Sequence, residues 1–578
     1  MGVSTKPVSF ETTNSCFNKS VCIVSKDGVI SSALGYRGTA AGRSASYGDA
    51  EAERNLVFSD WLRTEIAAPS RIRLQAHPTM NGINSEQPFK VIIVGAGVGG
   101  LTLAHCLHRA GIDYVVLDKH PVAPAWGASI SIFPQGARIL HQLGLLEAVH
   151  RQSADMYDFY NRGPDGKNFC SGPLLKDVQD RTGYVGITLE RRAYLRTLYE
   201  ELPDKTKVIE DARVSDVFEE ESRVKVVLSE GTTHEGDIVV GCDGVHSAVR
   251  EIMWQRAHRL SPGLITAEEK QSMKTEYCCL IGIAPSQYGL GTNEMTSVSN
   301  DRFSFLFLTQ PDNIYFLVPI KLPANQVCKY PNRLRWTDAD AEAKAAELAD
   351  CPVSDTLVFG DIWKTRTRGQ IVSLEEGILK HWFYGRIVLC GDAVHKVTPN
   401  AGLGGNLSME SAVVLANQLH AALNRHPNKK PSDEEIKLAF QRYYNIRAPR
   451  VKELFDISWV LTRMQAWDGW LWYFMQRWGL PIIGLKKVAE QVASSLRGAP
   501  TLSYVPFQQK VGLMEWYKQE WEVDQKAKNK ISSGKGSLNA LIVPIVLATL
   551  ALSLYELNSA VIGGRLLVIR FWGGSIHS

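Results

Sequence analysis

Short apolar runs alternate with segments of helical periodicity from residue 89 to about residue 420. Four runs are almost purely apolar: FKVIIV at 89–94, YVVL at 114–117, DIVV at 237–240 and RIVLC at 386–390. Runs of this kind are typical of parallel strands that are buried on both faces. A helical pattern at 101–107 separates the first two runs. The order of strand, helix and strand predicts an α/β architecture built on a parallel sheet.

A second group of runs alternates apolar and polar positions, which also predicts strands. These runs are RVKVVL at 223–228, EYCCLIGI at 276–283, FSFLFL at 303–308 and IYFLVPI at 314–320. Five aromatic residues in the last three runs are candidates for a binding pocket: Tyr277, Phe303, Phe305, Tyr315 and Phe316. By periodicity alone such side chains belong more often to a core, so both interpretations stay open.

Gly95, Gly97 and Gly100 directly follow the first strand, in the sequence GAGVGG. The first glycine allows a tight turn, the second lets the backbone approach a pyrophosphate, and the third lets helix and strand pack closely. Phosphates then bind at the helix N-terminus. Asp118 ends the second strand, where it can accept hydrogen bonds from ribose hydroxyls. The motif predicts a Rossmann-like dinucleotide site; the alternative is a glycine-rich turn in an unrelated α/β protein.

The sequence GDAVHKVTPNAGLGGN begins at Gly391, where the predicted strand 386–390 ends. Ligands of open α/β sheets collect at the carboxyl ends of the strands. Asp392 is therefore placed to accept a hydrogen bond from a flavin ribityl hydroxyl, although it can also be a strand-end turn residue. The helix predicted at 403–419 can direct its first N–H groups at the flavin ring or the pyrophosphate. No second GxGxxG follows a strand, which argues against a separate nicotinamide domain.

The segment GCDGVHSAVR at 241–250, which contains Asp243, completes a set of three motifs. Together they resemble the single-component FAD-dependent monooxygenases related to aromatic hydroxylases. The chain most closely resembles the fungal branch that epoxidises meroterpenoids, indole diterpenes and diterpenoid pyrones. The resemblance covers about residues 89–450, with an antiparallel-sheet substrate region at about 265–380. It implies FAD as cofactor and NADPH or NADH as electron donor, with the Asp243 segment serving both.

The resemblance also implies further contacts to FAD. The segment WGASISIFPQGARIL contains Ser131, and LERRAYLRTLY contains Arg191, with Arg192 as a close alternative. Gly405 falls where a small residue of the family touches FAD. The predicted cofactor-binding set is Gly95, Gly97, Gly100, Asp118, Ser131, Arg191, Asp243, Asp392 and Gly405.

No residue is predicted to be catalytic. His246 and His395 each stand in an FAD motif, and a structural role is favoured for both. An electron-rich alkene can be oxidised by flavin chemistry without an enzymic base, so the protein must mainly provide position and exclude water. The ten cysteines show no metal-binding spacing, and a net charge of +4 does not argue for a nucleic-acid partner. No metal and no nucleic acid are therefore expected.

The two ends of the chain differ from the body. Residues 1–88 are rich in Ser, Ala, Thr and Gly and lack a signal-peptide pattern, so we expect a disordered extension or a misassigned start. Residues 451–530 read as a helical, Trp-rich tail. Within it, 457–485 suits either a membrane interface or a core helical pair.

The run LNALIVPIVLATLALSLY at 538–555 is uncharged. As a helix it would span about 27 Å, against a hydrocarbon core of about 30 Å. Lysines precede it, which predicts a transmembrane anchor with the catalytic body facing the cytosol. The alternative is a buried C-terminal helix.

These observations predict an FAD-dependent monooxygenase that uses NAD(P)H and O₂. Its expected substrate is a prenylated (farnesyl or geranylgeranyl) polyketide, pyrone or indole, whose alkene is epoxidised before terpene cyclisation in secondary metabolism. One alternative is an aromatic-ring hydroxylase of a phenolic substrate. A second is a nonenzymatic dinucleotide-fold protein that binds a lipidated partner.

Overall fold

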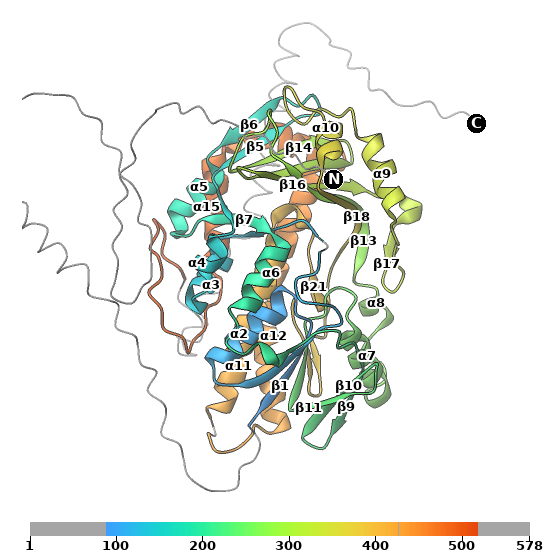
Figure 1. Cartoon of the computed structure of the whole chain (residues 1–578), viewed down its shortest axis with the longest axis vertical. Helices are drawn as coiled ribbons and strands as arrows, with labels where there is room; N and C mark the ends of the chain where they lie inside the picture. Colours follow the sequence, from blue (N-terminus) through green and yellow to red (C-terminus); the bar gives the residue numbers. More distant parts are fainter. Residues whose placement is uncertain (1–87, 126, 426, 518–578) are drawn as a thin grey trace, which may run out of the picture. The chain divides into compact units, whose positions relative to one another are not determined.

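The computed structural model describes residues 88–125, 127–425 and 427–517. The predicted extension 1–88, apart from Pro88, and the apolar run 538–555 lie outside these residues. Within the described part, the chain forms a parallel sheet covered by helices and a larger, mostly antiparallel sheet (Figure 1).

The apolar runs form the parallel sheet, whose strand order is β19–β20–β12–β1–β2–β8. Its strands are β1 (Lys90–Val94), β2 (Asp113–Leu117), β8 (Val208–Ile209), β12 (Ile238–Gly241), β19 (Phe383–Tyr384) and β20 (Ile387–Leu389). Every neighbouring pair is parallel except β19 and β20. β1, β12 and β20 are buried along almost their whole length, which explains their uninterrupted apolar sequences.

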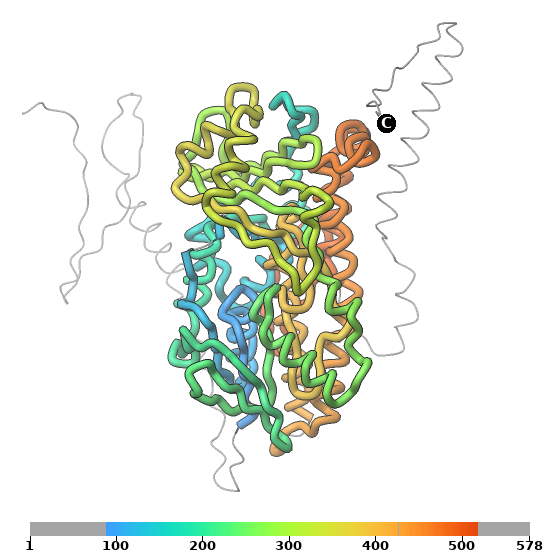
Figure 2. The backbone as a smooth tube through the Cα atoms, turned by 90° about the vertical axis from the view of Figure 1, so that its right-hand side faces the viewer, coloured from blue at the N-terminus to red at the C-terminus, as the bar shows by residue number. Residues whose placement is uncertain are grey.

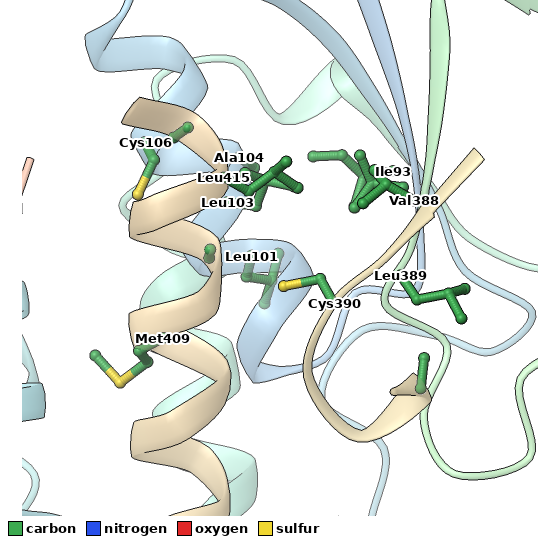
Figure 3. Packing of buried hydrophobic residues seen from close by; sticks show 14 of the residues in the cluster. Ile93, Leu101, Leu103, Ala104, Cys106, Val388, Leu389, Cys390, Met409 and Leu415 are labelled. Carbon is green, nitrogen blue, oxygen red and sulfur yellow. The ribbon is translucent and has the colours of Figure 1, made fainter. Parts of the chain in front are cut away.

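Helices α2 (Val98–Arg109) and α11 (Leu403–Leu423) pack together against this sheet. Figure 3 shows Leu101 and Leu103 of α2, Leu415 of α11 and Ile93 of β1 in one buried cluster. The two helices approach closely, because a Cβ on Gly99 would lie only 3.6 Å from the Cβ of Ser408. The GxGxxG turn and the segment after Gly391 therefore belong to one packed unit.

The larger sheet has the order β21–β18–β13–β16–β15–β14–β5–β6, with β17 paired to β13. Its strands are β5 (Asp158–Arg162), β6 (Asn168–Gly172), β13 (Lys274–Pro285), β14 (Glu294–Asn300), β15 (Phe303–Thr309), β16 (Asn313–Lys321), β17 (Cys328–Lys329), β18 (Arg368–Ile378) and β21 (His395–Lys396). The region predicted for this sheet, 265–380, supplies β13 to β18, but the other three strands come from elsewhere. β5 and β6 are rich in polar residues and show no clear apolar alternation in the sequence.

Two three-stranded sheets, β11–β10–β9 and β3–β7–β4, complete the sheets of the described residues. Their strands are β3 (Ser129–Ile132), β4 (Ala154–Met156), β7 (Gly186–Glu190), β9 (Val214–Glu220), β10 (Arg223–Leu228) and β11 (Thr233–Gly236). The other helices of the body are α3 (Pro134–Leu143), α4 (Leu146–His150), α5 (Leu174–Thr182), α6 (Arg191–Glu200), α7 (Ala248–Leu260), α8 (Ala267–Lys270), α9 (Asp338–Glu347) and α10 (Phe359–Thr365).

The tail continues the body without a break, because one long helix, α12 (Asp433–Gln465), runs through the boundary predicted at residue 450. It is followed by α13 (Trp470–Phe474), the π-helical turn η5 (Met475–Gly479), α14 (Leu480–Ile483) and α15 (Leu485–Leu496). Figure 2 shows these helices, in orange to red, along one side of the described body. Among the residues described, no helix combines the length and the apolar character needed to cross a membrane. The predicted anchor at 538–555 lies outside the described residues.

Candidate functional site

The turn between β1 and α2 requires glycine at two positions. Gly95 has a φ of +107°, and a Cβ there would lie 2.5 Å from the carbonyl oxygen of Cys242. A Cβ on Gly100 would lie 1.9 Å from the carbonyl oxygen of Gly95. Any side chain at either position would push α2 away from the sheet.

Gly97 is different, because a Cβ there would meet no atom of the described residues within 4 Å. Gly97 is the N-cap of α2 and has no side chain to cap the helix, and the first turn of the helix holds no acidic residue. The helix therefore presents its free N–H groups and the positive end of its dipole to open space. This is an arrangement that accepts a pyrophosphate.

Asp118 lies beside this turn. Its carboxylate accepts hydrogen bonds from the backbone N–H groups of Ala96, at 2.6 Å, and His120, at 2.9 Å. The residue therefore fixes the glycine turn as well as standing where a ribose is expected. Each carboxylate oxygen retains a further lone pair for a hydroxyl donor.

Arg191 is the first residue of α6, and its backbone N–H donates to the carbonyl oxygen of Ala128 at 3.0 Å. Burial lowers the pKa of its guanidinium, while the nearby carboxylates of Asp392 and Asp118 oppose that shift. Among the described residues, the guanidinium has no hydrogen-bond partner. A half-buried cation with free N–H donors between two of the predicted motifs fits a pyrophosphate. Arg192, the alternative from the sequence, lies next to it on α6.

Asp243 uses its carboxylate within its own segment. It accepts from Ser247 Oγ at 2.5 Å and from the backbone N–H of Val249 at 3.1 Å, which holds the start of α7. Burial raises the pKa of this carboxyl group. Arg250 then joins the second and third motifs, since its guanidinium donates to the carbonyl oxygens of Val245 at 2.8 Å and Ala393 at 3.0 Å. In this structure, the Asp243 segment holds the second and third motifs together.

The third motif places a cluster of charges next to Arg191. Asp392 forms an ion pair with Lys396. Burial tends to lower the pKa of Lys396, but Asp392 and Glu375 outweigh burial and the pKa is raised. Glu375 Oε1 also lies 3.5 Å from His246 Nε2. Sequence analysis missed Lys396, although it belongs to the third motif, and it had no signal for Glu375, which lies on β18.

His246 is surrounded by cations. Burial and the charges of Arg333, Arg250, Lys119 and Lys396 lower its pKa to about 4. The imidazole is therefore neutral at physiological pH. Since its neighbours are mainly cations, this corner of the site favours an anionic ligand.

His395 has a structural environment. It is buried, its Nε2 lies 2.9 Å from Ser411 Oγ, and its ring contacts Trp382. Burial and the charge of Arg447 lower its pKa to about 3. A permanently neutral, hydrogen-bonded imidazole at this position is not placed for proton transfer.

Ser131 and Gly405 meet at the loop that precedes α11. The Asn406 side chain donates to the carbonyl oxygen of Ser131 at 2.9 Å and accepts from the backbone N–H of Phe133 at 3.1 Å. Ser131 Oγ lies 3.0 Å from Thr188 Oγ1. A Cβ on Gly405 would come within 2.8 Å of the Ile130 side chain. Asn406, which the sequence did not single out, thus fixes β3 against the first turn of α11.

The loop 397–402 is fastened to α12 by side chains that sequence analysis also missed. Thr398 Oγ1 lies 3.0 Å from Ser458 Oγ and 2.6 Å from Thr462 Oγ1. Asn400 donates from Nδ2 to Gln465 Oε1 at 2.7 Å. Helix α12 therefore sets the position of the loop that leads into α11, the helix whose first N–H groups were predicted to face the flavin ring or the pyrophosphate.

One face of the large sheet lies toward this loop. Ile283, Leu308 and Tyr315 pack with Ala128 and with the half-buried Phe133. Phe133 is close to the loop, because a Cβ on Gly402 would lie 2.6 Å from its ring.

Farther along the same face, Tyr277, Cys279 and Leu374 pack against Ala466, which follows Gln465. Between these two contacts, the side chains of Ile281, Leu317 and Val372 are only partly buried. These three side chains form an apolar surface. It lies between the contact with Phe133 and the contact with Ala466 at the end of α12, and both Phe133 and α12 touch the loop 397–402.

The five aromatic residues proposed for a pocket divide between the two faces. Phe303, Phe305 and Phe316 belong to the opposite side, where Phe305 and Phe316 are fully buried against Phe359 of α10. They are core residues because α9 and α10 cover that face. Tyr315 and Tyr277 lie on the face toward the loop, but both are buried. Tyr277 donates to Asp468 Oδ2 at 2.8 Å, and Tyr315 donates to Gln310 Oε1 at 3.2 Å.

These features fit FAD without a change in the fold. The unobstructed N-terminus of α2 and the half-buried cation of Arg191 suit the pyrophosphate, Asp118 suits the ribose, and Asp392 lies beside Arg191 for the ribityl chain. Within the described residues, no cluster of His, Cys, Asp or Glu is arranged to hold a metal ion.

The family model described as FAD binding domain matches residues 88–264 and 292–436 of the chain. The chain therefore belongs to this family of flavoproteins. It is 50% identical over 434 residues to the FAD-dependent monooxygenase DEP2 of Alternaria brassicicola, covering 75% of this chain and 82% of that relative. It is 48% identical over 460 residues to DEP2 of Fusarium langsethiae, covering 78% of this chain and 88% of that one.

More distant relatives include the FAD-dependent monooxygenase atmM of Aspergillus flavus, which is 36% identical over 435 residues, 75% of this chain and 90% of that relative. Among solved structures, Klebsiella pneumoniae HpxO complexed with FAD and uric acid matches with a TM-score of 0.59 at 21% identity, over 71% of this chain and 97% of that one. The structural likeness shows the fold alone. The sequence relatives confirm a flavin monooxygenase of the fungal branch, and FAD as its cofactor.

Proposed function

We propose that this flavin monooxygenase epoxidises an alkene on the prenyl chain of a polyketide, pyrone or indole in fungal secondary metabolism, with NADPH or NADH as electron donor. The observation that carries the proposal is the apolar surface of Ile281, Leu317 and Val372, which lies between the two elements that contact the loop 397–402. A prenyl chain is apolar along its length and matches such a surface.

Bound FAD supplies an electrophilic oxygen derived from O₂ when a nicotinamide has reduced it. The residues of this chain bind and position the reactants. Asn406 and Asn400 hold the two sides of the loop, and the apolar face keeps water from the alkene. No acid or base is required at an alkene, in agreement with a pKa of about 3 for the buried His395.

The cations around His246 support the nicotinamide part of the proposal. Arg333, Lys119 and Lys396 all lie close enough to lower the pKa of His246. A nicotinamide dinucleotide carries two or three phosphate groups, which this positive corner would attract. The variant Arg333→Glu should therefore raise the KM for NADPH several-fold while FAD content stays unchanged.

The reaction is tested with the purified flavoprotein, NADPH, O₂ and a farnesyl- or geranylgeranyl-bearing aromatic or pyrone. The expected product is one oxygen atom heavier and carries an epoxide, and labelled O₂ should supply that atom. A product with a new ring hydroxyl and intact alkenes would replace the epoxidase by the aromatic hydroxylase. Incorporation of labelled oxygen from water into the product would exclude both the epoxidase and the hydroxylase.

We also propose that residues 538–555 anchor the enzyme in a membrane with the catalytic body on the cytosolic side. The support is the uncharged apolar sequence of the run and the lysines before it. The full chain should pellet with membranes and resist carbonate extraction, whereas a chain ending at Lys530 should be extracted more easily. Equal extraction of both would refute the anchor.

A further inference from the structure

Large apolar side chains are exposed along the outer side of the tail. Trp470 is 77% exposed, Ile482 is 55% exposed and Trp478 is 49% exposed. The set, which we call the aromatic face, consists of Trp459, Trp470, Leu471, Tyr473, Trp478 and Ile482. Isolated exposed apolar residues are ordinary, but five of these six lie within the 13 residues from Trp470 to Ile482, and a group of this density marks an interaction surface.

The aromatic face exists because the inner side of the same segment is fixed to the large sheet. Gln476 is buried; its Oε1 accepts from Ser299 Oγ at 3.1 Å, and its Nε2 donates to Asn161 Oδ1 at 3.3 Å. Met475 is buried beside it. With these two side chains directed inward, the neighbours Tyr473 and Trp478 point outward.

The charged residues of this segment are all cations. From residue 469 to residue 489 the sequence contains no Asp or Glu and three cations: Arg477, Lys486 and Lys487. The guanidinium of Arg477 stacks over the Trp478 ring at 4.7 Å. Lys486 and Lys487 are exposed, and Lys487 also contacts Glu490. Exposed Trp and Tyr rings combined with cations are the composition of surfaces that bind the headgroup region of anionic bilayers.

We propose that the aromatic face docks on the surface of an anionic phospholipid bilayer. Trp470, Trp478 and Ile482 would enter the boundary between headgroups and acyl chains, and the cations would contact lipid phosphates. The length of the chain supports this partner. The described residues end at Tyr517, and the apolar run 538–555 begins only 21 residues later, within reach of the same bilayer.

Docking at this face has a consequence for the substrate. η5 contacts the large sheet through the buried Gln476 and exposes Trp478, and a helix is ~10 Å across. A substrate dissolved in the bilayer would therefore enter the protein beside η5, an inference that rests on the proposed function. The docking itself is independent of the reaction and can be measured without any substrate.

The test uses the full chain with Val546→Asp and Leu550→Asp, which remove the apolar run as a means of attachment. This background protein should co-sediment with vesicles of phosphatidylcholine and phosphatidylserine, and high salt should weaken the binding. Addition of Trp470→Ser and Trp478→Ser should weaken it by about tenfold. The matched control is Tyr288→Ser, which removes an aromatic ring that is 92% exposed elsewhere on the protein and should leave binding unchanged.

FAD absorbance and NADPH oxidation of every variant show that the protein is folded, and these readouts do not depend on vesicles. The proposal fails if the background protein does not bind vesicles, or if the two Trp substitutions weaken binding no more than the Tyr288 control. It also fails if the substitutions convert a dimer to a monomer without affecting vesicle binding, since the face would then bind a second copy of the chain.

Discussion

Asn400 and Gln465 join the loop before α11 to the last residue of α12 through a hydrogen bond of 2.7 Å. Both side chains are buried, and Asn400 Oδ1 has no partner among the described residues. The variant Gln465→Leu would leave the Asn400 amide without any partner, and an unsatisfied buried polar group costs about 1–3 kcal/mol. Urea unfolding should show a loss of this size. Gln441→Leu on the exposed side of the same helix is the control and should change stability by less than about 0.5 kcal/mol.

Gly97 and Gly100 should respond differently to substitution, although both belong to one motif. A Cβ at Gly97 meets no described atom within 4 Å, whereas one at Gly100 collides with the backbone of Gly95. Gly97→Trp should therefore fold but lose FAD, because the indole occupies the space of the pyrophosphate. Gly100→Ala should lower the thermal midpoint of the protein. Flavin absorbance and circular dichroism separate the two effects, and full FAD content in Gly97→Trp would contradict the placement of the pyrophosphate.

Arg463 is the residue of α12 whose loss should destabilise the protein most clearly. Its guanidinium is buried and pairs with both Glu276, at 2.6 Å, and Glu376. Arg463→Met leaves the buried Glu376 without its cation, which costs about 3–5 kcal/mol for a buried pair, while Glu276 keeps its ion pair with Lys274. Lys452→Met breaks the exposed pair with Asp456 on the same helix and should cost less than about 1 kcal/mol. Similar losses in the two variants, measured by chemical denaturation, would contradict this ranking.

His395 should make the protein less stable in mild acid. Its pKa is about 3 in the folded state, below the usual value of 6.5. As the pH falls below about 6.5, the unfolded chain binds a proton that the folded state does not accept, so folding free energy is lost. By pH 5 the loss from this residue should reach about 2 kcal/mol. His395→Gln should show a shallower decline of stability between pH 7 and pH 5 than the wild type, measured by urea unfolding at each pH.

The parts of the fold that could be predicted from the sequence are those with a local pattern. Apolar runs located β1, β12 and β20, and the run 223–228 has the same bounds as β10. Strands β5 and β6 were missed because they pair at the edge of the large sheet and are rich in polar residues. The location of Phe305 and Phe316 depended on α9 and α10, whose packing on the outer face has no signature in the strands themselves.

The site shows the same division. The glycine turn and Asp118 follow one another in the sequence, so their proximity is local. The contact of His246 with Glu375 and that of Asn400 with Gln465 join residues that are distant in the chain. Only the tertiary fold brings these groups together, and a single sequence contains no signal for such pairs.

The strand order of the parallel sheet governs when the cofactor can be captured during synthesis. β1 ends at Val94 and β20 begins at Ile387, 293 positions later, yet only β12 separates them in the sheet. A nascent chain that has reached the Asp243 segment possesses the pyrophosphate turn but lacks Asp392 and α11. We therefore expect FAD to load only after α11 has been synthesised. Because the stabilisation by a bound ligand grows with the logarithm of its concentration above the Kd, flavin availability in the cell would influence how much of the newly made enzyme reaches its mature form.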